Sequence, residues 1–246
     1  MKRRHLTDGL RWLVATLAAL ALFRLWPGLD LAVSAAVFDA DGPSHFPLGQ
    51  ATLVQWTYLG VPWLGRLALL ACLVLAFRSA TPPRWRRRAQ VLLLALVLGL
   101  WGVVNVGLKD HWGRPRPTEV SAFGGPHPFQ PAGTVSPYCD KNCSFVSGHA
   151  ATGFLLMAVG LLGPPATRRR WWRIGLAAGL LIGAGRVLQG GHFLSDVVFA
   201  GLAMQGVCLL LRAGWVGWRW QRRRVPIIGA HEHPHHRCRT GGHQRR

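Results

Sequence analysis

Acidic residues are scarce in this chain of 246 residues, which contains 9 Asp and Glu against 29 Lys and Arg. Half of its residues are hydrophobic, 12 are Trp, and no internal repeat is visible. An ordinary water-soluble domain does not combine so many apolar residues with so large a positive charge. The apolar and the charged residues must therefore lie in different stretches of the chain.

Charge is missing from long apolar runs. The clearest run, Val91 to Leu108, is uncharged over roughly the 17–25 residues that a helix needs to cross a bilayer. Where a run carries one arginine near an end, such as Arg24 or Arg66, the side chain can snorkel to the interface. We therefore predict an all-α fold, a polytopic membrane bundle of about six transmembrane helices. The expected spans are Leu10–Trp26, Val61–Phe77, Val91–Leu108, His149–Gly163, Trp172–Val187 and Phe193–Leu211.

Lys and Arg are absent from the segment between Pro27 and Gly60, which carries Asp30, Asp39 and Asp41. The basic residues lie mostly in alternate segments: before the first span, between spans two and three, between spans four and five, and after the last span. This positive-inside pattern predicts that both termini are cytoplasmic and that the acidic loop is not. A nucleic-acid partner is not expected, since no recognisable DNA- or RNA-binding module accompanies the charge.

Two regions lie outside the apolar core of the chain. Cys139 and Cys143 stand close together in a segment expected outside the cytoplasm, where either a disulfide or two free thiols would fit. Residues 220–246 are rich in Arg and His, which predicts a disordered cytoplasmic tail after a membrane domain of residues 1–219. Its histidines invite a metal-binding interpretation, but a flexible tail lacks fixed geometry, so we favour a solvated basic tail near anionic lipid.

A segment rich in Pro and Gly joins spans three and four, and loops of this length usually carry function. Polar and ionisable residues gather there and at other span ends on the same extracytoplasmic side, and such residues near hydrocarbon indicate a functional site. They are Lys109, Arg116, Ser147, Gly148, His149, Arg186, His192 and Asp196.

These residue types suit phosphoryl transfer, in which donors must neutralise a negatively charged group. Lys109, Arg116 and Arg186 supply three cations, and arginine matches phosphate oxygens with paired donors. Ser147 and Gly148 precede an expected helix, whose N-terminal N–H groups bind anions. This set binds phosphate with no metal and no cofactor.

The spacing of His192 and Asp196 predicts that they share one helical face, where the carboxylate holds one imidazole nitrogen and leaves the other as a nucleophile. His149 is then available as the general acid, and later as the base that activates water against a phosphohistidine. A single residue of this kind would be weak evidence, but these residues recur in order on one predicted face.

The three motifs read KDHWGRPRP from Lys109, Ser147-Gly148-His149, and Arg186 followed by His192 and Asp196. Together they resemble the membrane-bound type 2 phosphatidic acid phosphatase family, which is related to vanadium haloperoxidases and bacterial acid phosphatases. The resemblance implies a six-helix bundle with a long extracytoplasmic active-site loop. It also implies that Lys109, Arg116, Ser147, Gly148 and Arg186 bind phosphate, while His149, His192 and Asp196 are catalytic.

Two positions depart from the family pattern: Val146 and Gly185 stand where the family usually has Pro and Ser. The runs FGGPHPF and CDKNCSFVSGH are similar to the lipid A phosphatase branch. The expected activity is therefore metal-independent dephosphorylation of a lipid at the periplasmic face of a bacterial inner membrane. Lipid A, undecaprenyl diphosphate and phosphatidylglycerol phosphate are the candidate substrates.

Three other functions stay open. The same residues would permit transfer of the phosphoryl group to a second lipid. An anion or lipid transporter would need polar residues or broken helices within the spans, which the sequence does not offer. A vanadate haloperoxidase would gain little from six membrane spans.

Overall fold

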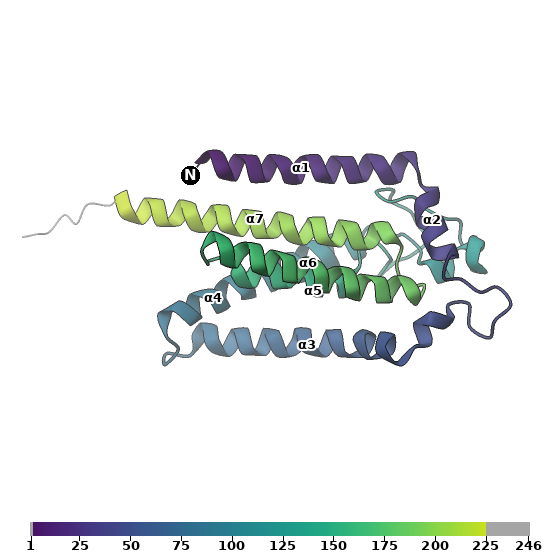
Figure 1. Ribbon diagram of the computed structural model, residues 1–246, viewed down its shortest axis with the longest axis horizontal. Helices are drawn as coiled ribbons and strands as arrows, with labels where there is room; N and C mark the ends of the chain where they lie inside the picture. The colour runs from purple at the N-terminus through teal and green to yellow at the C-terminus, as the bar shows by residue number, and fades with distance from the viewer. Residues whose placement is uncertain (1, 225–246) are drawn as a thin grey trace, which may run out of the picture.

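The computed structural model describes residues 2–224, with the side chains of residues 6–217. Within this range every regular element is helical, so the all-α prediction is confirmed. The long helices run side by side along the longest axis of the molecule (Figure 1). In chain order the elements are α1 (Lys2–Leu25), α2 (Gly28–Ala35), η1 (Pro47–Gln50), α3 (Thr52–Phe77), α4 (Pro83–Leu94), η2 (Ala95–Lys109), η3 (Pro117–Glu119), η4 (Ser121–Phe123), α5 (Gly148–Phe154), η5 (Leu155–Gly160), α6 (Pro165–Leu188) and α7 (Leu194–Arg224).

Four helical segments of the described chain are long and apolar enough to cross a membrane: Leu6–Leu25, Thr52–Phe77, Pro83–Lys109 and Leu194–Gly217. The fourth expected span is present as a shorter apolar helix, Gly148–Gly160. The fifth, α6, is long but carries arginines near both ends of its apolar part. The chain is therefore a polytopic helical membrane protein, in which four of the six expected spans meet both criteria.

Some boundaries differ from those expected. The second span begins at Thr52 rather than Val61, so Pro62 lies well inside α3 rather than next to its first residue. The third begins at Pro83, where α4 leads directly into η2, whose hydrogen bonds follow the wider π-helical pattern. The last helix continues to Arg224, beyond the expected domain end at residue 219. The rest of the predicted tail lies outside the described residues.

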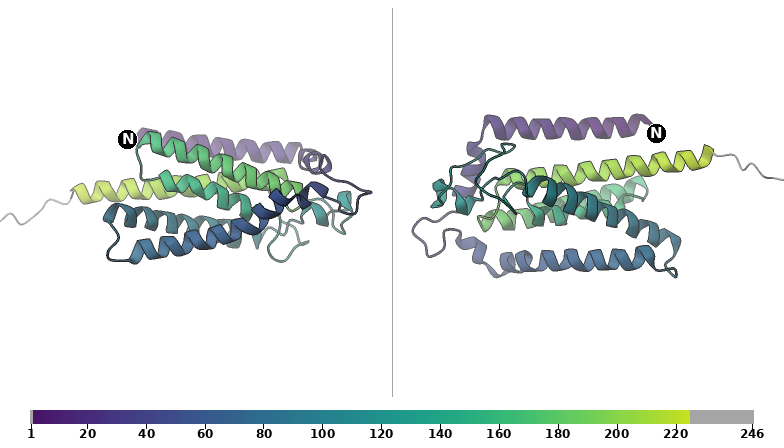
Figure 2. Two further views of the ribbon diagram at one scale, coloured as in Figure 1. Left: turned by 60° about the horizontal axis from the view of Figure 1, so that its bottom comes forward. Right: turned by 180° about the vertical axis from the view of Figure 1, so that it is seen from behind.

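The connecting segments sort onto two ends of the bundle (Figures 1 and 2). One end holds α2 and the loop to α3, the long segment after η2, and the turn between α6 and α7. The other holds the start of α1, the α3–α4 connection, the η5–α6 connection and the far part of α7. These are the two sets of segments that the sequence separates by charge. We name them the site end and the basic end.

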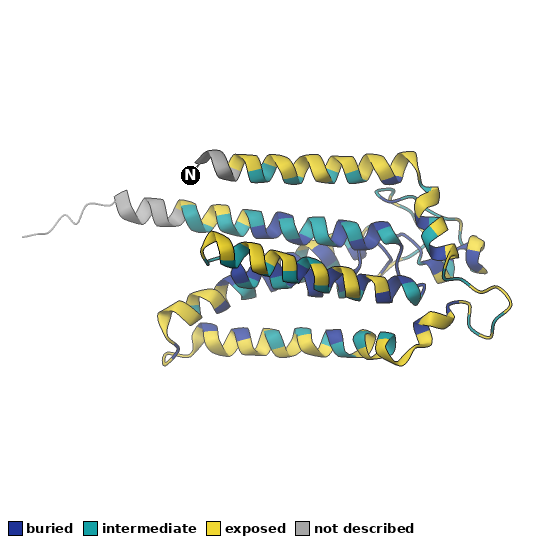
Figure 3. Cartoon of the chain, in the orientation of Figure 1, coloured by how far each residue is buried: buried dark blue, intermediate teal, exposed yellow. Residues whose placement is uncertain are grey.

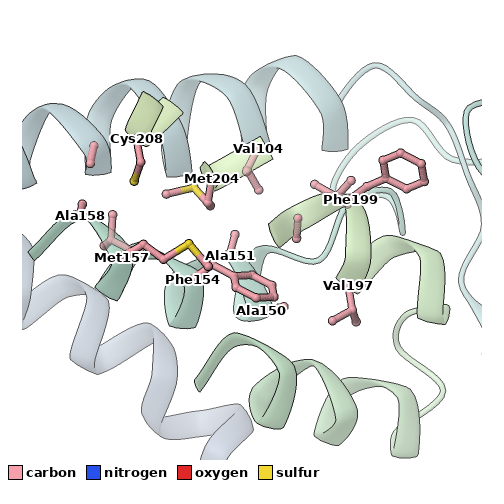
Figure 4. Packing of buried hydrophobic residues seen from close by; sticks show 14 of the residues in the cluster. Val104, Ala150, Ala151, Phe154, Met157, Ala158, Val197, Phe199, Met204 and Cys208 are labelled. Atoms are coloured by element: carbon pink, nitrogen blue, oxygen red, sulfur yellow. The ribbon is translucent and has the colours of Figure 1, made fainter. Parts of the chain in front are cut away.

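The core lies between α5, η5, α6 and α7, with η2 against α7, whereas α1 and α3 flank the bundle and expose most of their apolar side chains (Figure 3). Phe154, Met157 and Met204 pack at the centre (Figure 4). Small residues allow this close packing. A Cβ atom on Gly179 of α6 would lie 2.3 Å from the ring of Phe154, and one on Gly183 would lie 2.3 Å from Val197. Glycines on α6 thus bring the end of α5 and the start of α7 against its second half.

Candidate active site

Three segments distant in the sequence meet at the site end: the end of η2, the start of α5, and the turn between α6 and α7. A Cβ atom on Gly148 would lie 3.3 Å from Asn105 Oδ1 and 3.8 Å from Lys109 Cδ, so α5 begins directly against η2. The Ser147 N–H donates to the Asp196 carbonyl oxygen at 3.1 Å, which joins α5 to α7. Residues from all three predicted motifs therefore share one site.

His192 is almost fully buried, with 1% of its surface exposed. Its Nδ1 atom lies 2.8 Å from the Ser144 carbonyl oxygen. Because a carbonyl only accepts, Nδ1 carries the proton and Nε2 keeps a free lone pair. Burial lowers the pKa of His192 from its ordinary 6.5 to about 4, so the ring is neutral near pH 7. Both features suit a nucleophile.

Asp196 Oδ2 lies 3.6 Å from His192 Nδ1, which is too long for a hydrogen bond but close enough to stabilise a positive charge on the ring. Its Oδ2 atom accepts from the Ser144 hydroxyl at 2.6 Å and from the Phe193 N–H at 2.8 Å. The expected shared helical face is replaced by a different arrangement, since α7 begins only at Leu194 and His192 precedes it. Ser144 contacts both residues and so links them.

Behind Asp196 lies a buried charge network that the sequence analysis missed. Arg114, with no exposed surface, donates to Asp196 Oδ1 at 2.6 Å and to Asp30 Oδ2 at 2.8 Å. It also donates to Ser195 Oγ at 2.8 Å. Ser195 in turn donates to Asp30 through its hydroxyl and its N–H. We name Asp30, Arg114, Ser195 and Asp196 the carboxylate network.

Arg114 and Asp30, the two charged residues that the sequence analysis missed, differ in how well a sequence pattern could have indicated them. Arg114 stands in the same run as Arg116, and the repeated Arg-Pro was a signal for it. Asp30 belongs to α2 and lies 165 positions before Ser195. No spacing pattern links the two, so only the fold reveals this contact.

The three predicted cations surround the same space. Lys109 donates to the Asn142 side chain, and Arg116 donates to the Asn142 carbonyl oxygen at 2.8 Å. Lys109 interacts electrostatically with Arg116 and with Arg186, and all three cations act on His149. Their charges therefore converge on one position, as the binding of a phosphoryl group requires.

Arg186 lies with its guanidinium carbon 4.6 Å from the ring centroid of Tyr58, and it donates to Gln189. Its Nε atom is buried and has no hydrogen-bond acceptor among the described residues. A buried donor without an acceptor is costly. The oxygen of a bound phosphate would satisfy it. A polar cleft of about 250 Å³ opens beside Arg186, with Ser44, Gln55 and Thr118 in its lining.

His149 opens α5 and is held by α3. Its Nε2 atom lies 3.2 Å from the Tyr58 carbonyl oxygen, and its ring stacks on the Tyr58 ring at a centroid distance of 5.3 Å. Tyr58 thus contacts both His149 and Arg186. Sequence reasoning missed it, because this residue falls in the stretch assigned to a loop.

Ser147 caps α5 by accepting the N–H of Ala150 at 3.4 Å. Its hydroxyl is therefore engaged, and its place in the site is to fix the helix start, whose first N–H groups lack intrahelical acceptors. The backbone N–H groups of Gly148 and His149 belong to this first turn. Ser147 thus stands at the N-cap and Gly148 is the first residue of α5, while phosphate binding by these two residues stays a prediction.

A disulfide joins Cys139 to Cys143. The Cys143 N–H donates to the Lys109 carbonyl oxygen at 3.1 Å, so the bridged loop is attached to the end of η2. In the described part of the chain, no group of three His, Cys, Asp or Glu side chains is placed to hold a metal ion. The histidines of the predicted tail lie outside that part, and metal-free chemistry stays a prediction.

Comparison with known proteins identifies the family of the chain. Residues 90–224 match the PAP2 superfamily. The chain is 34% identical over 209 residues to a lipid A 4'-phosphatase of Francisella tularensis subsp. novicida, covering 82% of this chain and 91% of that protein. It is 35% identical over 202 residues to a lipid A 4'-phosphatase of Rhizobium leguminosarum, covering 76% and 87%. No solved structure matches. The chain therefore belongs to the PAP2 superfamily and is a phosphatase.

Proposed function

We propose that the chain is a metal-independent lipid phosphatase that removes a phosphate from lipid A through a phosphohistidine on His192. The observation that carries the chemistry is the state of His192. Its ring is buried and neutral, its Nδ1–H is fixed on the Ser144 carbonyl, and its Nε2 lone pair is free. This is the form in which an imidazole attacks phosphorus.

In the first step, the Nε2 lone pair forms a bond to phosphorus while the bond from phosphorus to the sugar oxygen breaks. That oxygen leaves with the electron pair and takes a proton from His149. In the second step, His149 removes a proton from water, whose oxygen attacks phosphorus. The bond to Nε2 then breaks, which releases phosphate and restores His192.

Asp196 and the cations support both steps. Bonding to phosphorus makes the His192 ring positive, and Asp196, 3.6 Å away, stabilises that charge. Lys109, Arg116 and Arg186 hold the phosphate oxygens, and the N-terminal turn of α5 adds backbone donors. The negative charge of the phosphate dianion also offsets the positive charge that these three cations place near His149.

The relatives named lipid A 4'-phosphatase support lipid A as the substrate, since they align with most of this chain. The polar cleft beside Arg186 suits a sugar headgroup, because its lining supplies hydroxyl and amide groups. The exposed apolar surfaces of α1 and α3 suit contact with acyl chains.

We place the enzyme in a bacterial inner membrane, with the site end periplasmic and both termini cytoplasmic. The asymmetry of charge supports this orientation. The α1–α3 loop at the site end carries no Lys or Arg before Gly60, while arginines crowd the connections at the basic end.

The test is phosphate release from lipid A by the purified chain in detergent with EDTA, comparing wild type with His192→Ala. EDTA-resistant release that His192→Ala abolishes is expected, together with a phosphoryl group trapped on the wild-type chain by alkaline quenching, because the P–N bond of a phosphohistidine survives base but not acid. Release that survives His192→Ala would overturn the mechanism.

Parallel reactions separate the substrates and the fate of the phosphate. Undecaprenyl diphosphate and phosphatidylglycerol phosphate are the matched comparisons, and faster release from either would replace lipid A. A reaction that requires a second lipid as acceptor would identify a phosphotransferase instead.

A further inference from the structure

A second cleft, of about 450 Å³, lies at the basic end between α1, η5, α6 and α7. Arginines line it on three of these helices: Arg11 on α1, Arg168 and Arg169 on α6, and Arg212 on α7. One carboxylate, Asp8, is also present. The size matches that of typical small-molecule sites.

This cleft is separate from the phosphatase site. Arg169 and Arg186 lie on the same helix, seventeen residues apart, which corresponds to about 25 Å along the axis. That separation approaches the roughly 30 Å thickness of the hydrocarbon layer of a bilayer. An anion in the cleft would therefore lie at the opposite membrane surface from His192.

The positive charge of the cleft is mostly uncompensated. Arg212 pairs with Asp8 at 3.2 Å, and Arg168 donates to the Gly163 carbonyl oxygen at 3.0 Å. Arg11 and Arg169 form no hydrogen bond or ion pair with any residue that the structure describes. The positive charges of Arg212 and Arg169 also repel that of Arg168. Such a cluster has free paired donors that match phosphate oxygens.

The remaining walls are apolar and lead toward the core. Met157 and Leu161 come from the α5–η5 segment, and Leu209 from α7. Trp172 stands at the edge, 41% exposed, with its indole N–H directed to Gln205 at 3.5 Å. Trp is typical of the level of lipid headgroups. The cleft thus joins a cationic rim to apolar walls, which suits an amphiphile better than a free anion.

We propose that this cleft binds an anionic glycerophospholipid of the leaflet opposite the active site, with its phosphate on the arginines and an acyl chain along Met157 and Leu209. Basic pockets between membrane helices recognise lipid headgroups in this way. In the described chain, Asp8–Arg212 is the one ion pair between α1 and α7. The bound lipid would add a second connection at this end, between α1 and the pair α6 and α7.

The experiment uses the full-length chain in nanodiscs of phosphatidylcholine with a minor fraction of phosphatidylglycerol, both with the same acyl chains. Native mass spectrometry then counts the lipids that remain bound. Wild type is expected to retain one phosphatidylglycerol. In Arg168→Gln/Arg169→Gln the ratio of lipid-bound to lipid-free protein should fall about tenfold or more, since each arginine supplies charge-assisted hydrogen bonds.

The matched control is Arg84→Gln/Arg87→Gln, which removes two exposed arginines of α4 at the same end but outside the cleft. It is expected to retain phosphatidylglycerol like wild type. Equal retention by the cleft variant and the control would overturn the proposal. So would equal retention of phosphatidylcholine, or displacement of the lipid by excess inorganic phosphate.

Phosphate release by each variant reports whether it has folded, because the cleft is remote from His192. If the double variant loses this activity, Arg169→Gln alone takes its place, since that side chain is exposed and makes no hydrogen bond to a described residue. Because the readout is bound lipid, a negative result leaves the phosphatase assignment unchanged.

Discussion

The two ends of the bundle use arginine in opposite ways. At the site end Arg114 is fully buried and Arg186 is 8% exposed, and aromatic rings lie against both. At the basic end Arg84, Arg87 and Arg169 are exposed. Burial fixes the direction of each guanidinium donor at the site end, whereas an exposed guanidinium at the basic end stays free to turn toward a lipid headgroup and adds to the charge that sets the topology. One residue type therefore serves two functions, and the surroundings decide which.

The strongest contrast between the ends is expected in stability. Arg114→Met leaves Asp30 and Asp196 buried without a counter-charge, which costs about 3–5 kcal/mol. Arg87→Met at the basic end is expected to change the free energy of unfolding by less than about 0.5 kcal/mol. Reversible unfolding in detergent without anionic lipid measures both. Similar losses at the two sites would show that burial is not what distinguishes the ends.

The next contrast is in the response to pH. His192 titrates near 4 when folded and near 6.5 when unfolded, so the unfolded chain binds more protons between these values. Its contribution to stability, about 3 kcal/mol, is therefore complete above pH 6.5 and is lost as the pH falls toward 4. Among the described side chains His192 is the one buried histidine, so this pH dependence belongs to the site end.

Measuring unfolding from pH 7 to 4 in wild type and in His192→Asn isolates this effect, since the carboxylates are common to both. The acidic limb that His192 imposes on kcat/KM is expected near pH 4. A stability that falls equally with pH in wild type and in His192→Asn, or a wild-type acidic limb near pH 6.5, would contradict the buried, neutral ring.

A smaller effect is expected at Tyr58, whose ring contacts His149 and Arg186. Tyr58→Ala removes the stacking and the cation–π contact and should lower kcat/KM about tenfold. Tyr58→Phe keeps the ring and should stay near wild type. If Tyr58→Phe is as defective as Tyr58→Ala, the hydroxyl rather than the ring is the important group.

The smallest effect tests how tightly Arg186 is placed. A Cβ atom on Gly191 would lie 2.2 Å from Arg186 Nη2, so Gly191→Ala must displace the guanidinium. We expect KM to rise about threefold, with a smaller change in kcat. Gly214→Ala on α7, which has no atom within 4 Å of the added methyl group, is the control. Equal kinetics in both variants would mean that Arg186 has freedom to move.

Sequence alone predicts the site as far as membrane topology determines it. Lys109, Ser147 and Arg186 fall at span ends, and alternating spans bring those ends to one surface whatever the details of packing. The all-helical membrane fold follows from the same apolar runs. Local spacing was less reliable: His192 and Asp196 are four positions apart, but α7 begins between them.

The remaining parts of the site depend on packing that no local pattern encodes. Tyr58 was assigned to the loop before the expected span at Val61, yet α3 starts at Thr52 and so includes Tyr58. Asp30 was assigned to an acidic loop outside the membrane, although the fold buries it against Arg114. From sequence alone, a charged residue in a polar segment is assigned to solvent, because its distant ion-pair partner is not known.

The contact between Asp30 and Ser195 also sets an order of events during biosynthesis. Translation at roughly 5–20 residues per second separates these two residues, 165 positions apart, by about ten to thirty seconds. Arg114 is made about halfway through that interval, and Asp196 only after it. His192, Asp196 and Ser195, the last partner of Asp30, are all made together, in the turn before α7 and at the start of that helix. The growing chain therefore passes most of its synthesis without a working site, and insertion of its last helix is the step that creates the enzyme.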